Sequence, residues 1–280
     1  MSLFSKSSQR GVLPGFGLTL GVTLLYFSIL VALPLLAMLY KSFNLGWADF
    51  WSIISSERAV ATYRITISAA LLATTLNAVF GVLLAWVLVR YEFPGKRLLD
   101  AAVDLPFALP TAVAGLALVT IFSANGWFGQ YLEPLGIKVA YAPLGIALAM
   151  MFTSIPFVIR TVQPVLEDVA TDVEEAARSL GATNRQIFMR IIWPAILPAF
   201  IAGCSLSFAR SVGEFGAIVF ISGNLPFETE VMSLLVFIRL DEYDYPAAAA
   251  IATVMLAFAF IMLFVTNSLQ AWQLRYAERN

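Results

Sequence analysis

The sequence predicts an all-α protein that crosses a membrane six times. Hydrophobic residues make up 60% of its 280 residues and charged residues only 12%, and the mean hydropathy is +0.84. A soluble domain typically carries about 25% charged residues, so this composition indicates a polytopic membrane protein. The apolar residues also gather into runs of about the 20 residues that a helix needs to cross a bilayer. These runs are residues 11–40, 65–89, 98–122, 142–162, 194–222 and 246–269.

The first and third runs differ in how regular a helix they are expected to form. Residues 11–40 are uncharged, exceed the core of a signal peptide and lack an A-x-A cleavage site, so we expect a retained span with a kink at Pro34. The Trp- and Phe-rich segment 41–63 is typical of a membrane interface. The third run contains residues that interrupt helices or are costly in lipid: Asp104, Pro106, Pro110 and Gly115. Its first half is therefore not expected to be a regular helix.

The fifth run carries two charged residues four positions apart, Arg210 and Glu214. Positions i and i+4 share one face of a helix, so the two can pair. A charge at the bilayer centre costs about 2.5–3.5 kcal/mol on insertion scales, so both should face protein or water. Two interpretations stay open for the pair: it orients the helix, or it belongs to a translocation pathway or gate with Ser207 and Asp104.

The basic residues predict which side of the membrane each loop occupies. Eleven lie on the side of the termini and of the loop after the fourth run, five lie on the other side, and Arg210 lies within a run. Because positive residues collect in the cytoplasm, we expect both termini there and segments 41–63, 123–141 and 223–245 outside. The cytoplasmic set is Lys6, Arg10, Arg90, Lys96, Arg97, Arg160, Arg178, Arg185, Arg190, Arg275 and Arg279.

A charged segment, residues 171–194, interrupts this hydrophobic chain and predicts two short helices joined by a bend. Thr171-x-x-Glu174 and Thr183-x-x-Gln186 both match the capping box that begins a helix. Gly181 lies between them, where a left-handed residue can end a helix. An apolar face precedes the bend, formed by Val173, Ala176, Ala177 and Leu180. Small residues allow close approach, which favours docking of a partner over a merely solvated loop.

This segment resembles the EAA loop of ABC importer permeases. The residues that carry the resemblance are Glu175, Ala176, Ala177, Gly181, Ile191 and Pro194. Trp193 replaces the leucine that usually precedes the proline, and it keeps that position apolar. The resemblance implies a coupling helix that sits in a cleft of a cytoplasmic ATPase.

Longer stretches resemble the oxyanion branch of these permeases. Residues 104–118, 154–167, 207–224 and 244–252 are similar to sulfate/thiosulfate permeases of the CysT type, while the GEFGA stretch is also shared with molybdate permeases. The resemblance implies a type I ABC importer permease fold in the cell inner membrane. It also implies a heterodimer with a CysW-type permease, two copies of a CysA-type ATPase, and a periplasmic sulfate- or thiosulfate-binding protein.

The expected function is ATP-driven import of sulfate or thiosulfate by a subunit that is not itself an enzyme. The sequence has no histidine, which excludes Ser-His-Asp catalysis and histidine metal ligation, and it has no P-loop pattern for ATP hydrolysis. We expect no catalytic residue, metal or cofactor. An importer of molybdate or another oxyanion, an ion-coupled secondary transporter using Arg210 and Glu214, and a membrane scaffold remain as alternatives.

We expect three segments along the chain. Residues 1–60 hold a cytoplasmic tail, the first span and an outer loop. Residues 61–270 form the permease core with five spans and the coupling loop at 171–194, and residues 271–280 form a second cytoplasmic tail.

Overall fold

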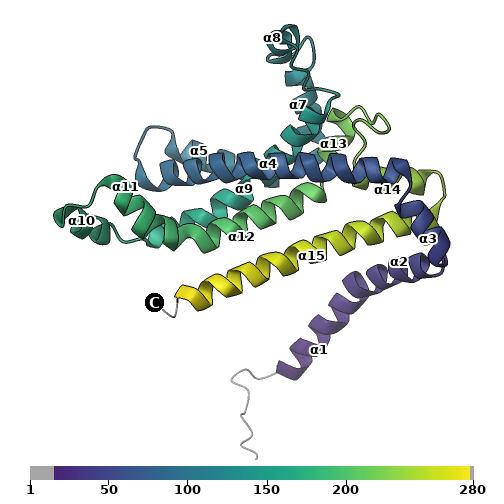
Figure 1. The fold of residues 1–280 in the computed structure, drawn as a ribbon, viewed down its shortest axis with the longest axis horizontal. Helices are drawn as coiled ribbons and strands as arrows, with labels where there is room; N and C mark the ends of the chain where they lie inside the picture. The colour runs from purple at the N-terminus through teal and green to yellow at the C-terminus, as the bar shows by residue number, and fades with distance from the viewer. Residues whose placement is uncertain (1–15, 278–280) are drawn as a thin grey trace, which may run out of the picture.

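The structure is a computed structural model that describes residues 16–277. The tail with Lys6 and Arg10, and the last basic residue, Arg279, lie outside the described residues. Within residues 16–277 every regular element is a helix, which confirms the predicted all-α class. Figure 1 shows long helices running side by side in a bundle, with short helices at both ends. Near the N-terminus, α2 (Leu33–Phe43) packs on the C-terminal helix α15 (Tyr245–Ala277).

Five helices of the described range are long and apolar enough to cross a membrane, and they match predicted runs one, two, four, five and six. The helix α4 (Glu57–Arg90) begins earlier than residue 65 because the Ser56 hydroxyl caps it, accepting a hydrogen bond from the Ala59 N–H (3.4 Å). The five helices are Phe16–Phe43, Glu57–Arg90, Pro143–Asp168, Asn184–Val212 and Tyr245–Thr266.

The third predicted run is divided into three helices, which confirms that its first half is irregular. These helices are α5 (Lys96–Val103), α6 (Leu105–Ala108) and α7 (Thr111–Phe122). A helix of twelve residues is about 18 Å long, shorter than the roughly 30 Å of a bilayer core. Figure 1 shows α7 and the following α8 (Gly129–Leu132) projecting away from the long helices.

The fifth predicted run is also divided, so our expectation of one span from 194 to 222 is wrong. The helix α12 (Trp193–Val212) ends at Gly213, and α13 (Gly216–Ile221) follows after a short break. The helix α13 packs closely on α7, since a Cβ on Gly115 would lie 2.3 Å from the Ala217 carbonyl oxygen. Only glycine permits this approach, and it places the two broken runs side by side.

Two π-helical segments precede prolines in the long apolar helices. The π segment η1 (Ser28–Ala32) joins α1 (Phe16–Phe27) to α2 (Leu33–Phe43), and η3 (Phe188–Ile192) lies between α11 (Asn184–Ile187) and α12. Each ends two residues before a proline, Pro34 or Pro194. Proline lacks an N–H and its ring clashes with the carbonyl four residues earlier, and a wider turn relieves both problems. Figure 1 shows a change of direction between α1 and α2, and Pro34 lies in the first turn of α2.

The centre of the bundle is a close-packed group of three helices, α4, α9 (Pro143–Asp168) and α12. A Cβ on Gly81 would lie 2.8 Å from Val158 Cγ1, and one on Gly203 would lie 2.9 Å from the Val158 Cα. Val158 therefore fills the space that the two glycines leave. The short helices at the ends of the bundle are α3 (Trp47–Ile54), η2 (Glu133–Leu135), α10 (Thr171–Ser179) and α14 (Met232–Asp241), and the last long helix is α15 (Tyr245–Ala277).

Candidate functional site

The predicted coupling segment lies at one end of the bundle, with α10 and α11 beyond the ends of the long helices (Figure 1). The bend between its two helices forms as predicted. Gly181 has a φ of +85°, the left-handed conformation that favours glycine. The N–H groups of Gly181 and Ala182 donate to the carbonyls of Arg178 (2.9 Å) and Ala177 (3.0 Å). These two bonds form a Schellman motif, which ends α10 at a defined angle.

One of the two predicted capping boxes is present and the other is wrong. At the start of α11, the Thr183 hydroxyl accepts from the Gln186 N–H and the Gln186 side chain accepts from the Thr183 N–H (2.8 Å). At the start of α10, the residue before the helix is Ala170 and no side chain caps it. Glu174 instead lies in an ion pair with Arg90, and both side chains are largely shielded from solvent. The contact is an ion pair by distance, because Glu174 Oε1 has no aligned hydrogen bond among the described residues.

A narrow apolar stripe along α10 and the residue that follows it is exposed among polar residues. Val173 and Leu180 are 50% and 90% exposed, and Glu175 and Ala176 are exposed beside them. Ala177 packs inward against the core cluster that includes Ile187 and Ile192. A cavity of about 370 Å³ adjoins the bend and is lined by Leu180, Gly181, Ala182, Gln186, Ile187, Arg190 and Ile191. Two of the predicted docking residues, Gly181 and Ile191, line this cavity, and Pro194 is exposed at the start of α12.

Arg210 and Glu214 pair as the spacing predicted. Arg210 Nη1 lies 2.6 Å from Glu214 Oε2; the glutamate is 1% exposed, whereas the arginine side chain is 33% exposed. Glu214 lies in the break after α12, and its Oε1 accepts the Ala217 N–H (3.0 Å). The carboxylate therefore also caps the short helix α13. Its Oε2 is close to the guanidinium but has no aligned hydrogen bond among the described residues, so this contact is an ion pair by distance.

Ser207 lies in a buried polar cluster that sequence reasoning missed. Its hydroxyl donates to Ser154 Oγ (3.0 Å) and accepts from Asn77 Nδ2 (3.2 Å), and Ser211 also donates to Ser154. The four residues are buried between α4, α9 and α12. A polar Asn77 within an apolar run was the available signal. The structure thus connects Ser207 to helix packing, and its role in a pathway stays a prediction.

Asp104 belongs to a different group, centred on Arg160 of α9. The Arg160 guanidinium donates to both Asp104 carboxylate oxygens (2.9 and 2.7 Å), to Asp100 Oδ1 (2.6 Å) and to Gln163 Oε1 (2.7 Å). These bonds hold the broken third run against α9. Asp104 is not brought together with Arg210, and its predicted role in a pathway or gate stays untested.

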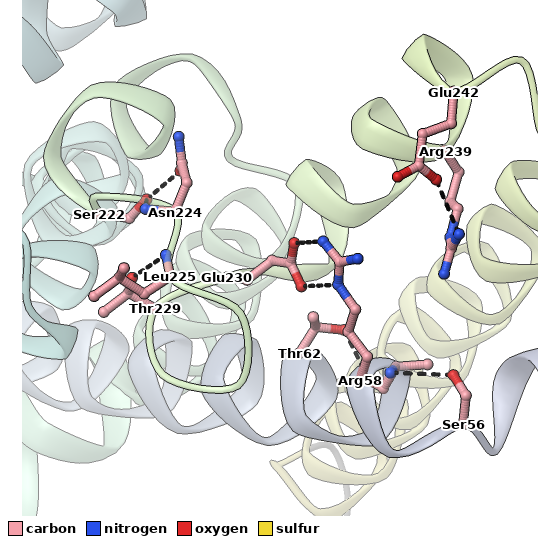
Figure 2. Close-up of polar contacts among 11 residues, drawn as sticks. Ser56, Arg58, Thr62, Ser222, Asn224, Leu225, Thr229, Glu230, Arg239 and Glu242 are labelled. Atoms are coloured by element: carbon pink, nitrogen blue, oxygen red, sulfur yellow. Dashed lines mark hydrogen bonds and ion pairs between the residues drawn. The ribbon is translucent and has the colours of Figure 1, made fainter.

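The opposite end of the bundle carries an ordered loop, residues 222–231, shown in Figure 2. Glu230 is fully buried and accepts two hydrogen bonds from Arg58 of α4, from Nε (2.8 Å) and from Nη2 (2.6 Å). The Leu225 N–H donates to Thr229 Oγ1 (2.9 Å) and closes the loop on itself. Arg58 lies 172 positions before Glu230 in the chain, so no local sequence pattern indicates this pair.

Comparison with known protein families places this helical arrangement in one of them. Residues 77–277 match the family model described as binding-protein-dependent transport system inner membrane component. The chain belongs to this family. As an inner membrane component it is a transport protein and not an enzyme.

Among relatives of this inner membrane component are the sulfate transport system permease proteins CysT. The protein from Salmonella typhimurium is 54% identical and covers 94% of this chain and 95% of its own length. The Escherichia coli K12 protein is 54% identical over 96% of this chain and 97% of its own length. The Synechocystis protein is 49% identical, with coverages of 92% and 90%. The similarity therefore extends over nearly the whole chain and includes the first span.

Solved structures share the fold. A bacterial ABC transporter that imports the acidic polysaccharide alginate matches with a TM-score of 0.75 at 18% identity, covering 91% of this chain and 94% of that one. The MetNI methionine ABC transporter in an inward-facing conformation matches with a TM-score of 0.56 at 16% identity, with coverages of 76% and 93%. At these identities the likeness concerns the fold alone, and it confirms an ABC importer permease architecture.

Proposed function

We propose that this chain is the permease subunit of an ATP-driven importer that carries sulfate and thiosulfate from the periplasm to the cytoplasm. The observation that carries the proposal is 54% identity to sulfate permeases across almost the full length of both chains. A match of this extent covers the loops between the helices as well as the helices themselves. The GEFGA stretch, residues 213–217, is part of it, and in this structure it forms the break that contains Glu214.

The proposed complex contains a CysW-type permease, two copies of a CysA-type ATPase and a periplasmic sulfate- or thiosulfate-binding protein. The exposed apolar face of α10 and the adjoining 370 Å³ cavity support an ATPase dock. The projecting apolar helix α7, with Val113 and Leu116 exposed, supports burial against a second permease. Both termini and α10 are proposed to face the cytoplasm on the basis of the positive residues.

The charges along the proposed pathway suit a mobile dianion. Arg210 is the basic residue of the fifth run, and Glu214 neutralises much of its charge at 2.6 Å. A pathway must bind its substrate weakly enough to release it, and an unpaired buried arginine would hold a dianion tightly. In this proposal Arg210 binds the oxyanion transiently, while the negative charge of Glu214 prevents the arginine from binding the anion too tightly.

Uptake by the purified complex tests the proposal. The full complex is placed in vesicles with the loaded binding protein outside and ATP inside, and uptake of labelled sulfate, thiosulfate and molybdate is measured. We expect ATP-dependent uptake of sulfate and thiosulfate well above that of molybdate. Uptake of molybdate alone would assign the chain to the other oxyanion branch, and uptake driven by an ion gradient without ATP would support a secondary transporter.

A further inference from the structure

The helix α4 is an uninterrupted connection between the two ends of the bundle. Its 34 residues contain no proline, and at 1.5 Å per residue it is about 51 Å long. Its neighbours are interrupted: α9 contains Pro156 and Pro164, and α12 follows a π segment and contains Pro198. Because interruptions of the hydrogen-bond ladder are the usual sites of bending, α4 is expected to move as one stiff unit.

At its inner end α4 is joined to the coupling helix through Arg90. Arg90 Nη2 lies 2.6 Å from Glu174 Oε1, and the two side chains are only 15% and 10% exposed. The same nitrogen donates to the Val169 carbonyl (3.4 Å), at the junction of α9 and α10, and the guanidinium lies over the Trp86 ring. Most other side chains of α10 are exposed, so Glu174 is the main polar attachment of this helix to the bundle.

At its outer end α4 is joined to residues 223–231, the outer loop, through Arg58. The two hydrogen bonds between Arg58 and Glu230 are parallel, as Figure 2 shows, and a bidentate pair fixes orientation as well as distance. About two turns further along α4, Thr66 Oγ1 accepts a hydrogen bond from the Met232 N–H (2.9 Å), which anchors the end of the loop. The outer loop is thus attached to the first turns of α4.

We propose that α4 is a rigid connector that transmits displacement of α10 to the outer loop, with Arg90, Glu174, Arg58 and Glu230 as positioning residues. The inference rests on the proposed function, because it takes α10 as the dock of the ATPase. Both ion pairs have one almost fully buried carboxylate, and a buried charge must keep its partner when either element moves. ATP-driven motion of α10 therefore displaces Arg90, the whole of α4 and then Glu230.

The experiment measures amide hydrogen exchange of residues 223–231 in the complete importer, with and without ATP, together with the number of anions imported per ATP hydrolysed. In the unmodified complex ATP should change the exchange of the outer loop. In Glu174→Gln we expect that change and the transport ratio to fall about tenfold, within the range of about 5- to 150-fold typical of coupling between two sites. ATP hydrolysis itself should continue, since the docking face is unchanged.

Matched controls separate coupling from general loss of charge. Glu92 at the same end pairs with Lys96 in the same turn (2.7 Å) and is highly exposed, so Glu92→Gln should behave as the unmodified complex. At the outer end, Glu230→Gln should uncouple, whereas Glu242→Gln, which alters the local pair with Arg239 (2.9 Å), should not. Arg90→Lys keeps a positive charge within reach of Glu174 and should retain most of the response.

Normal ATP-dependent exchange of the outer loop in an assembled Glu174→Gln complex overturns the inference. If that variant does not assemble, Arg90→Lys and Arg90→Gln are compared instead, and equal responses in these two overturn it. Because the exchange measurement needs only ATP and the ATPase, it remains decisive if the imported anion is not sulfate or thiosulfate. Failure of uptake in the unmodified complex would count against the proposed function alone.

Discussion

At the scale of single residues, each buried carboxylate within the described part of the chain has a specific arginine. Glu174 contacts Arg90, Glu214 contacts Arg210 and Glu230 contacts Arg58, each at 2.6 Å. Only the Arg210 pair was visible in the sequence, because its members are four residues apart. The other two join residues distant in the chain, and no local pattern indicates them.

The Arg210–Glu214 pair should be asymmetric toward substitution. Arg210→Ala leaves an almost fully buried carboxylate without a counter-ion, and breaking a buried pair typically costs about 3–5 kcal/mol. Glu214→Gln leaves an arginine that is one-third exposed and can reach water. The amide oxygen of the new side chain can still accept a hydrogen bond from the Ala217 N–H. We expect the thermal transition of the solubilised complex to fall further in Arg210→Ala than in Glu214→Gln.

The double variant Arg210→Ala/Glu214→Gln separates structure from transport for this pair. It should regain the assembly that Arg210→Ala loses, because no unpaired charge remains. If Arg210 also receives the oxyanion, this well-assembled variant should transport poorly. Full uptake would leave the pair with a structural role only.

At the scale of elements, local sequence determined the bends and boundaries that depend on a few adjacent residues, and tertiary contacts determined the others. Gly181, Pro34 and the Thr183 capping box all act as predicted, since each depends on a few adjacent residues. The start of α10 differs, because Glu174 binds a distant arginine instead of capping its own helix. The break after Val212 was missed because the hydrophobic run continues to residue 222, whereas the close packing of α13 on α7 is visible only in the tertiary structure.

The bend at Gly181 offers a test of the coupling loop. A Cβ there would meet no atom within 4 Å, so any effect of substitution comes from the positive φ. The left-handed conformation costs an L-residue about 1–2 kcal/mol, with asparagine the best tolerated. We expect Gly181→Val to tilt α11 and reduce co-purification of the ATPase or its coupling to uptake, while Gly181→Asn stays close to normal. Equal co-purification and transport in both variants would contradict the assignment of this bend.

At the scale of the whole molecule, the two ends of the bundle have different surfaces. One end carries α10 and α11 with an exposed apolar face, and the other carries α3, α14 and the outer loop (Figure 1). The aromatic helix α3 holds Trp47 and Trp51, stacked with ring centroids 6.0 Å apart and exposed, as expected at a membrane interface. The positive residues predict that the α10 end is cytoplasmic.

Cysteine labelling in intact cells checks this orientation. In a Cys204→Ser background, single cysteines at Ser55, Asn125 and Glu228 should react with an impermeant thiol reagent added outside, because all three positions are exposed at the predicted outer side. Glu228 is preferred to Asn224, whose φ of +55° and hydrogen bond to Ser222 a cysteine would disturb. Ser179→Cys, on α10, should remain unlabelled until the cells are opened. Labelling of Ser179→Cys from outside would reverse the topology.

The sequence by itself determined the membrane class, most of the spans, the bend of the coupling loop and the family resemblance. All of these depend on composition or on residues close together in the chain, such as Glu175 to Gly181. Tertiary structure alone decided that Ser207 joins Asn77 in a buried cluster, that Asp104 binds Arg160, and that α4 is held by an ion pair at each end. The physical reason is that a buried polar group must find a partner wherever the fold places one, and that partner is set by helix packing and not by proximity in the chain.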